Sequence, residues 1–205
     1  TIQESQIKNN YSKYNASFSA NLEKGKIKAS LKLSPSFSIK NAPNTLYSFA
    51  VPPTIAPYDQ EGNYTRFTTY GNPLAVANQN RILIETQALL NSASLAYDIL
   101  ESLHFSTLFG MDFSNKDQDT YYSGLNETGI DNNGNRGQRI VRDRDTRRWN
   151  WNAKLLFDKQ LSENHFMDAL AGVETRGNTV RFAYARGKNF PEPGKIMPVE
   201  TATIR

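Results

Sequence analysis

The sequence has no cysteine, no long apolar run and no strong imbalance of charge. Without cysteine, disulfides and thiolate metal sites are excluded. No run of about 18 apolar residues exists, which excludes a membrane-spanning helix. The longest uncharged candidate, Thr86–Tyr97, is too short and contains Asn91, Ser92 and Ser94. The 24 Lys and Arg against 20 Asp and Glu leave a net charge of +4, and this modest, mixed charge argues against nucleic acid as the main partner.

What the chain does contain is a nearly regular alternation between Lys26 and Lys40. One face would carry Ile27, Ala29, Leu31, Leu33, Phe37 and Ile39, and the other Lys28, Ser30, Lys32, Ser34, Ser36 and Ser38. Successive side chains of a strand point to opposite sides, so this pattern predicts a strand between an apolar and an aqueous phase. It exceeds the usual strand length of about 5–6 residues, whereas a strand crossing a bilayer needs roughly 9–11.

Six such strands are predicted, joined by connections that are alternately short and long. The strands cover residues 11–23, 26–40, 81–98, 103–114, 148–158 and 165–176. The short connections are Glu23–Lys26, where Gly25 can adopt positive φ, Ile99–Ser102 and Gln160–Asn164. The long ones are a proline-rich loop at Asn41–Asn80, a Gly- and Asn-rich loop at Asn115–Arg147, and the start of a third within Gly187–Pro198.

This alternation is typical of outer-membrane barrels, which have tight periplasmic turns and long outer loops. A mean hydropathy of −0.61 is compatible with such a barrel, since each strand keeps one polar face. Trp149 and Trp151 are expected at the outer interface and Phe157 near the inner one. The residues predicted to face lipid are Phe18, Leu31, Leu33, Phe109, Met111, Trp149, Trp151, Leu155 and Phe157.

The competing fold is a soluble β-sandwich, whose strands also alternate. The strand lengths disfavour it, and so do loops of several tens of residues where soluble domains have about 4–6. Six strands cannot close a membrane barrel, because the smallest have about 8. The chain also opens at Thr1 without a signal-like segment and stops at Arg205 just after a loop-like stretch, so we expect both ends to be cuts within a longer polypeptide.

A series of short motifs resembles the SusC/RagA-type TonB-dependent outer-membrane transporters. In the first long loop they are Pro57-Tyr58-Asp59, Gly62-Asn63-Tyr64 and Gly71-Asn72-Pro73-Leu74-Ala75. Further on they are Leu95-Ala96-Tyr97-Asp98-Ile99, Leu103-His104-Phe105, Gly110-Met111-Asp112, Trp149-Asn150-Trp151-Asn152, His165-Phe166 and Leu170-Ala171-Gly172-Val173-Glu174. The resemblance covers nearly the whole chain, and it depends on the order and spacing of these motifs. Glu101-Ser102 departs from the pattern, because the family usually has a glycine in that turn.

The resemblance implies an all-β fold: residues 1–205 would be about six antiparallel strands of a transmembrane β-barrel of about 22 strands, with long extracellular loops. The N-terminal plug, the TonB box and the rest of the barrel would lie outside this chain. It further implies a Gram-negative outer-membrane location, a SusD-like surface lipoprotein as lid, energy from the TonB complex, and import of oligosaccharides or peptides.

Enzymatic and metal chemistry find little support. His104 and His165 are expected to be structural, with no triad spacing around them. The stretch beginning at Asp131 is similar to a calcium loop, but Arg142 occupies the position of the bidentate glutamate. Asp117 and Asp119 are interpreted as solvated loop residues. We therefore expect no catalytic residue, no metal and no cofactor.

Two groups of polar and aromatic residues are candidates for binding a ligand or partner. If the fifth predicted strand extends beyond the membrane, Arg142, Arg144 and Arg148 share the lumen-facing parity of Asn150 and Asn152, whereas Asp143 and Asp145 share the outward face. Cross-strand ion pairing on a protruding hairpin is favoured over a guanidinium site for anionic groups or for the lipoprotein.

The second group is the set of aromatics in the first long loop. These are Tyr47, Phe49, Tyr58, Tyr64, Phe67 and Tyr70, with Asp59 beside them. Packing within the loop is favoured over stacking on sugar rings, and partner contact is compatible with either. The candidate residues here are Tyr58, Asp59, Tyr64 and Tyr70.

Three functions follow as hypotheses. The first is a SusC-like importer without bond-breaking chemistry. The second is a SusC-like barrel serving as a structural component of an outer-membrane secretion or assembly complex; a degenerate or missing plug and TonB box would favour it. The third and weakest is a soluble carbohydrate-binding β-domain, which would extract without detergent.

Overall fold

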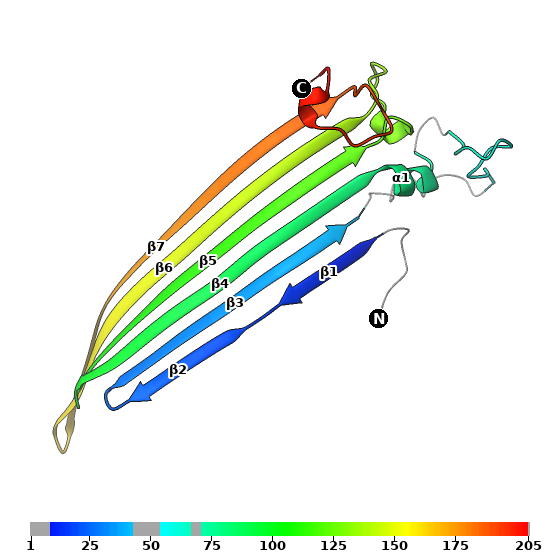
Figure 1. Ribbon diagram of the computed structural model, residues 1–205. Coiled ribbons are helices and arrows are strands. Elements are labelled where there is room, and N and C mark those ends of the chain that lie inside the picture. Colours follow the sequence, from blue (N-terminus) through cyan, green and yellow to red (C-terminus); the bar gives the residue numbers. More distant parts are fainter. Residues whose placement is uncertain (1–8, 43–53, 67–70, 205) are drawn as a thin grey trace.

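The computed structural model describes residues 9–42, 54–66 and 71–204, whose strands form one long, curved antiparallel sheet (Figure 1). The strands are β1 (Asn10–Asn15), β2 (Phe18–Lys24), β3 (Ile27–Asn41), β4 (Arg81–Leu100), β5 (Leu103–Tyr122), β6 (Gln138–Ser162) and β7 (His165–Lys188). Their order is β1-β3-β4-β5-β6-β7, and β2 also pairs with β3. The expected all-β, antiparallel barrel-wall segment is therefore confirmed.

The first predicted strand is interrupted. Residues 11–23 form two strands, β1 and β2, which pair one after the other with β3. The strand pairing is interrupted between the pairs Asn15–Ser36 and Phe18–Leu33. Pro35 of β3 lies opposite this gap, and a proline has no N–H to donate to a neighbouring strand. Its carbonyl still accepts a hydrogen bond from the N–H of Ala16 at 3.1 Å. The interruption thus follows from one residue on the partner strand.

Strands β5, β6 and β7 run well beyond their predicted ends. The prediction of a loop at Asn115–Arg147 is wrong for most of that range, because residues 115–122 continue β5 and residues 138–147 begin β6. Likewise, β7 continues past Arg176 to Lys188. In residues 177–188 the large apolar residues Val180, Phe182 and Tyr184 lie on the polar face, and in residues 115–122 and 138–147 charged and polar residues replace most of the apolar half of the alternation. A search for apolar residues at every second position therefore misses strands whose backbones are nevertheless fully paired.

The alternation of short and long connections is confirmed. Gly25 adopts φ of 59° in the β2–β3 turn, a conformation that glycine adopts at little cost. Two-residue turns at 101–102 and 163–164 join β4 to β5 and β6 to β7. All three turns lie at one end of the sheet, and the long connections lie at the other (Figure 1).

The small buried core lies among the long connections rather than beneath the sheet. These connections contain α1 (Pro73–Gln79), η2 (Glu127–Gly129) and η3 (Val199–Thr201). The buried apolar residues are Ala75, Val76, Ala77, Tyr121, Ile140, Phe190 and Ala202. Tyr121 is 1% exposed, and its hydroxyl donates to the carbonyl of Pro193 at 2.7 Å. The core therefore orders one end of the sheet.

Most large apolar side chains lie outside this core. Leu31, Phe109 and Leu155 remain 39%, 43% and 38% exposed, respectively. In the described residues no second layer covers the face on which they lie, whereas a sandwich packs a second sheet about 10 Å away. This observation disfavours the soluble sandwich. None of the helices in the described ranges is long and apolar enough to cross a membrane.

Candidate functional site

The sheet has one predominantly apolar face along its turn-end half. Strand register aligns the residues predicted to face lipid: Phe18 with Leu33, Met111 with Trp149 and Phe109 with Trp151. Leu31, Leu155 and Phe157 lie in neighbouring rows of the same face. Leu33 and Phe157 are half-buried and the other seven are exposed. On β6 this apolar stretch spans residues 149–157, which matches the roughly 9–11 residues of a membrane crossing.

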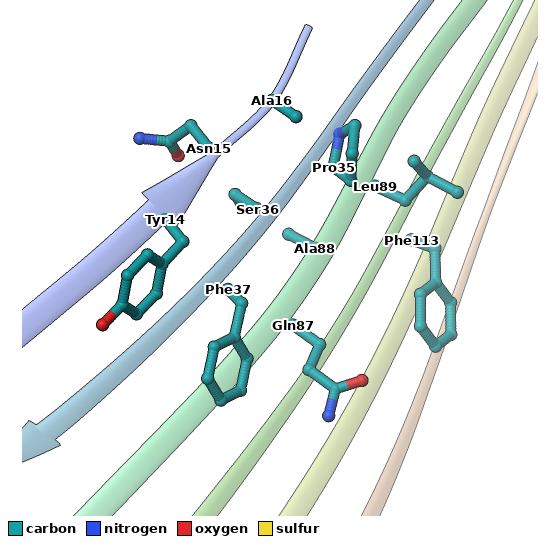
Figure 2. Close-up of a pocket in the computed structure, with 10 residues that line it drawn as sticks. All are labelled: Tyr14, Asn15, Ala16, Pro35, Ser36, Phe37, Gln87, Ala88, Leu89 and Phe113. Carbon is teal, nitrogen blue, oxygen red and sulfur yellow. The ribbon is translucent and has the colours of Figure 1, made fainter.

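A hollow of about 600 Å³ opens on the apolar face where β1 ends (Figure 2). It adjoins the gap that Pro35 creates, and it is lined mainly by apolar groups. The lining residues are Tyr14, Asn15, Ala16, Pro35, Ser36, Phe37, Gln87, Ala88, Leu89 and Phe113. Phe113, one of the lining residues, has the guanidinium of Arg147 5.7 Å from its ring centroid. The lining of the hollow suits hydrocarbon better than a polar solute.

In the half of the sheet nearest the long connections, one face carries mostly cations, whereas on the other face acidic residues lie among arginines. Strand register groups Lys116 with Arg144 and Asp112 with Arg148 on the polar face. It groups Glu85 with Asp117, and Asp117 with Asp143, on the other face. The structure therefore agrees with the predicted placement on β6. One face carries Arg142, Arg144 and Arg148, and the other carries Asp143 and Asp145.

The favoured interpretation of the arginines, cross-strand ion pairing, is not what the structure shows. Among the described residues, no ion pair joins Arg142, Arg144 or Arg148 to a carboxylate. Arg142 instead lies 5.5 Å from the ring centroid of Tyr184. Asp143 and Asp145 accept hydrogen bonds from the side-chain amide of Asn115, at 3.3 and 2.9 Å. The guanidinium groups thus keep most of their donors available.

The acidic residues form a row on the face opposite these arginines. Partial burial, together with the nearby charges of Asp143, Glu85 and Asp145, raises the pKa of Asp117 above its ordinary value. The interpretation of Asp117 and Asp119 as solvated loop residues is wrong, since both belong to β5. Among the described residues, no group of three or more His, Asp or Glu side chains has a metal-binding arrangement.

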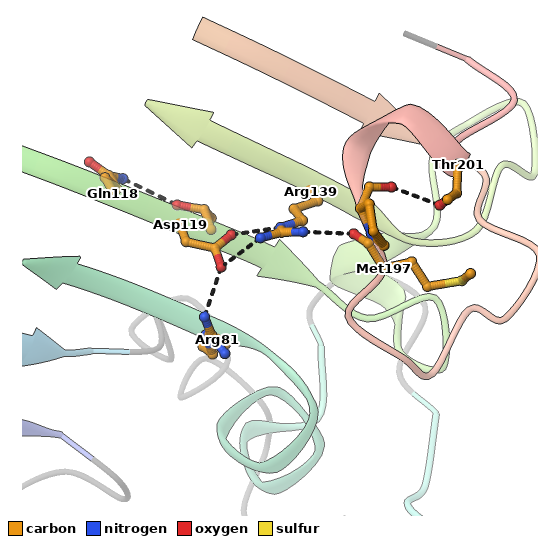
Figure 3. A network of polar contacts seen from close by, with 8 residues as sticks. Arg81, Gln118, Asp119, Arg139, Met197 and Thr201 are labelled. Atoms are coloured by element: carbon orange, nitrogen blue, oxygen red, sulfur yellow. Dashed lines mark hydrogen bonds and ion pairs between the residues drawn. The ribbon is translucent and has the colours of Figure 1, made fainter. Parts of the chain in front are cut away.

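A charged network fixes the third long connection to the sheet (Figure 3). Arg139 of β6 donates from Nε to Asp119 Oδ1 at 3.0 Å and from Nη2 to Asp119 Oδ2 at 3.3 Å. Arg81 of β4 donates to Oδ2 of the same carboxylate at 2.8 Å. The Nη1 of Arg139 donates to the carbonyl of Met197 at 2.9 Å. Sequence reasoning missed this network because its members come from three strands and a distant loop.

Tyr58, Asp59 and Tyr64 belong to a small hairpin in the first long connection. Tyr58 and Tyr64 form an isolated bridge, and their rings stack with centroids 5.3 Å apart. Asp59 Oδ1 accepts from the backbone N–H groups of Glu61 and Asn63, at 2.9 and 2.8 Å. Local packing therefore occupies all three candidates, as the favoured interpretation expects. Tyr47, Phe49, Phe67 and Tyr70 lie outside the described residues.

The motif at residues 71–75 has a clear structural role. Asn72 is fully buried and caps α1, accepting from the N–H groups of Leu74 and Ala75 at 3.0 and 3.4 Å. Its amide nitrogen donates to the carbonyls of Pro57 and Thr65, at 2.7 and 3.0 Å. One side chain thus joins the helix to the 57–65 hairpin.

A second buried amide network joins the first two long connections. The amide nitrogen of Asn126 donates to Gln79 Oε1 and Asn80 Oδ1, both at 3.0 Å. Asn80 donates in turn to the hydroxyl of Thr128 at 2.7 Å and accepts from the N–H of Ser123 at 2.8 Å. The sequence offered no signal for this network, since its hydrogen bonds join residues 43 to 48 positions apart.

The segment at Asp131 repeats the hairpin at Asp59. Both have the pattern D-x-x-G-N, a glycine with positive φ (Gly62 and Gly134) and an aspartate accepting from two backbone N–H groups. Asp131 differs by an ion pair with Lys188 of β7 at 3.0 Å. Hydrogen bonds from Asn135 and Lys188 hold the pKa of its carboxyl far below the ordinary range. The calcium-like loop is thus a turn braced against β7.

This depressed pKa predicts how the second long connection responds to acid. The Asp131 carboxylate stabilises the hairpin fully above the ordinary aspartate pKa of about 3.9, and that contribution is lost as pH falls through the lower folded pKa. In hydrogen exchange on the full-length protein, residues 131–137 should keep their protection from neutral pH down to about pH 5 and lose it in stronger acid.

The variant Asp131→Asn should weaken that protection at neutral pH and abolish its dependence on acid. Asp59→Asn provides a matched control, because it alters the twin hairpin, whose aspartate has no lysine partner among the described residues. Wild-type protection in Asp131→Asn at neutral pH would contradict the assignment.

His104 connects three strands at the turn end, on the polar face. Its Nδ1 lies 2.6 Å from Asp98 of β4, and its Nε2 lies 3.1 Å from Asp158 of β6. His165 is exposed at the start of β7. His104 thus links β4, β5 and β6 through two carboxylates, and the structural role expected for both histidines stays a prediction.

No protein-family model matches the chain, and no curated protein matches it. Solved structures do match: the RagAB peptide importer in its closed-closed state (TM-score 0.75), the RagAB peptide transporter (0.74) and the importer in its open-open state (0.72). Each match covers 96% of this chain and 23% of the other, at 16% identity. The chain folds like one part of the RagAB importer. At this identity the likeness establishes the fold, and the chain spans about a quarter of the RagAB chain that it matches.

Proposed function

We propose that this chain is part of the barrel wall of a SusC/RagA-type, TonB-dependent importer in a Gram-negative outer membrane. The observation that carries the proposal is a single sheet with an exposed apolar band on one face and the cations Arg142, Arg144 and Arg148 on the other. Over 96% of this chain, the sheet matches the RagAB structure. In the proposed orientation, hydrocarbon contacts the apolar band and the polar face lines a water-filled path. The three short turns then face the periplasm, and the long connections lie outside.

The proposed substrates are short chains, and peptides are favoured over oligosaccharides because the matching structures are those of a peptide importer. The partner is a SusD-like lipoprotein seated on the end that carries α1 and the loop core. Coupling to the TonB complex requires a plug and a TonB box elsewhere in the protein. The proposed role is transport, with no bond-breaking step.

Deleting the gene tests this proposal in the native bacterium. We expect the deletion strain to lose growth on oligopeptides as sole nitrogen source while growing normally on free amino acids. Inactivating TonB should reproduce the defect, and tagged full-length protein should co-purify with a surface lipoprotein. Unimpaired oligopeptide uptake, with secretion or assembly components co-purifying, would overturn the proposal in favour of the scaffold role.

A further inference from the structure

The polar face of β5, β6 and β7 carries a dense cluster of cations. We define the basic tract as Lys116, Arg142, Arg144, Arg148, Arg176 and Arg186, which all have the same parity in the strand register. Only three of the six, Arg142, Arg144 and Arg148, were candidates from the sequence. Register adds Lys116 beside Arg144 from β5, and Arg176 and Arg186 from β7. The tract therefore exists only in the assembled sheet.

Negative charge is scarce on this part of the face. Over polar-face positions 108–120, 140–152 and 174–186, the carboxylates are Asp112 and Glu174, so six cations against two anions leave +4. The other acidic residues of these strand segments, Asp117, Asp119, Asp143 and Asp145, point to the opposite side. This part of the polar face thus carries a net positive charge, and a surface of one sign attracts ligands of the other.

The cations of the tract have few protein partners. Arg142 packs near Tyr184, and Arg186 donates to Gln138 Oε1 at 3.1 Å. In the described ranges no tract residue forms an ion pair. Contrast Arg139, on the other face of β6, which uses its guanidinium on Asp119 and Met197. Arg81 and Arg139 are thus both paired with Asp119, whereas among the described residues no cation of the tract has a carboxylate partner.

Two adjoining hollows give the tract a shape that can hold a chain. One, of about 400 Å³, contains Arg148, Asn150 and Arg176. The other, of about 360 Å³, contains Lys116, Arg144 and Arg148. They share Arg148 and Asp112, so they form one continuous surface along the strands. Phe182 and Tyr184, which are 61% and 50% exposed, lie beside Arg144 and Arg142 in the register and offer apolar contact.

We propose that the basic tract binds the carboxylates of acidic peptides, and so selects peptides rich in Asp and Glu among the substrates of the transporter. This rests on the proposed function and specifies its substrate class. A guanidinium presents paired N–H donors that match a carboxylate in bidentate fashion, which explains why five of the six cations are arginine. The amides of Asn150 and Asn178, next to Arg148 and Arg176, supply further donors and acceptors for peptide groups.

Binding of labelled peptides to the full-length protein, purified with its lipoprotein, tests the proposal. The probes are an octapeptide alternating Glu and Gly and its Gln–Gly counterpart. An oligogalacturonate and a neutral oligosaccharide of equal length form a second pair, because uronic acids also carry carboxylates. We expect the wild type to prefer the Glu peptide over the Gln peptide by roughly tenfold or more and to lose this preference at high salt. Preference for the oligogalacturonate over the Glu peptide would overturn the assignment to peptides.

The variant combines Arg142→Gln, Arg144→Gln and Arg148→Gln, and its matched control combines Arg147→Gln and Arg181→Gln. The control removes arginines from the same two-strand region but from the opposite face. We expect the tract variant to bind the Glu peptide roughly 10–100-fold more weakly, with little change for the Gln peptide, and the control to behave as wild type. An affinity within about twofold of wild type, or an equal loss for both peptides, would overturn the proposal.

Uptake by cells separates this proposal from the proposed function. If cells import Glu and Gln peptides equally, and the tract variant does the same, transport stands and the basic tract is not the selective site. If the purified protein shows the expected charge preference while the deletion strain imports peptides normally, the site stands and the importer role fails.

Discussion

Replacing Phe109 by arginine is expected to destabilise the folded barrel by about 2–4 kcal/mol, the cost of a charge on the lipid face near the middle of the membrane. Phe109 is 43% exposed on the apolar face and lies between Ala93 and Trp151 in the register. It also lies in the middle of the apolar run of β5, between Leu103 and Phe113. The arginine would have to reach an interface or leave the hydrocarbon, and each option disturbs the sheet.

The adjacent residue supplies the matched control. Leu108 has similar exposure, 36%, but lies on the polar face between Ser94 and Asn152. Leu108→Arg should therefore leave stability nearly unchanged. The measurement is urea unfolding of full-length protein in bilayers, with the folded fraction in outer membranes read from gel mobility before and after heating. Equal destabilisation by the two arginines would refute the assignment of the apolar face to lipid.

Replacing Asp119 by alanine is expected to destabilise the loop-bearing end of the sheet by about 1–3 kcal/mol. The Asp119 side chain is 16% exposed and receives hydrogen bonds from Arg81 and Arg139. Removing it leaves two guanidinium groups close together without their shared carboxylate. Breaking a fully buried pair costs about 3–5 kcal/mol, but the Arg81 side chain is 41% exposed, so solvent relieves part of that cost.

The effect should be local and should reach the third long connection. Arg139 also donates to the carbonyl of Met197, so releasing its guanidinium should free the segment around η3. Hydrogen exchange on the full-length protein should show lost protection at residues 197–202 and unchanged protection in the β2–β3 turn. Gln118→Ala is the control, since this neighbour lies on the other face and its side chain donates to Thr120, at 3.2 Å, and not to the third long connection as far as the described residues show. Unaltered exchange at 197–202 in Asp119→Ala would contradict the role given to this network.

Sequence reasoning performed best where side-chain parity and turn chemistry decide the outcome. It predicted the apolar face, the three short turns and the opposite placement of Arg144 and Asp145, because these depend on residues close together in the chain. It failed on residues 115–122 and 138–147, where charges alternate with charges and no apolar period marks a strand. It also missed the interruption between β1 and β2, whose cause lies on β3.

The candidate site was predictable only in part for the same reason. Arg142, Arg144 and Arg148 share one strand, so their common face was evident, whereas Lys116 and Arg176 join them through register with β5 and β7. The cross-strand ion pairs expected for these arginines are not found among the described residues. Register places Gln118 and Tyr184 beside Arg142, and Lys116 and Phe182 beside Arg144. Asp112 lies beside Arg148 but forms no ion pair with it. Conversely, the Asp119 pairs unite residues 20 and 38 positions apart.

The amino-acid sequence alone thus determined that this protein forms long strands with one apolar face, because the two-residue period of a strand is a local property. Tertiary structure alone decided how charge is distributed in space: which cations gather into one tract, and which are paired and hold the loops. The physical reason is that strand register brings distant segments together, and no property of one strand specifies which residues it will meet on its neighbours.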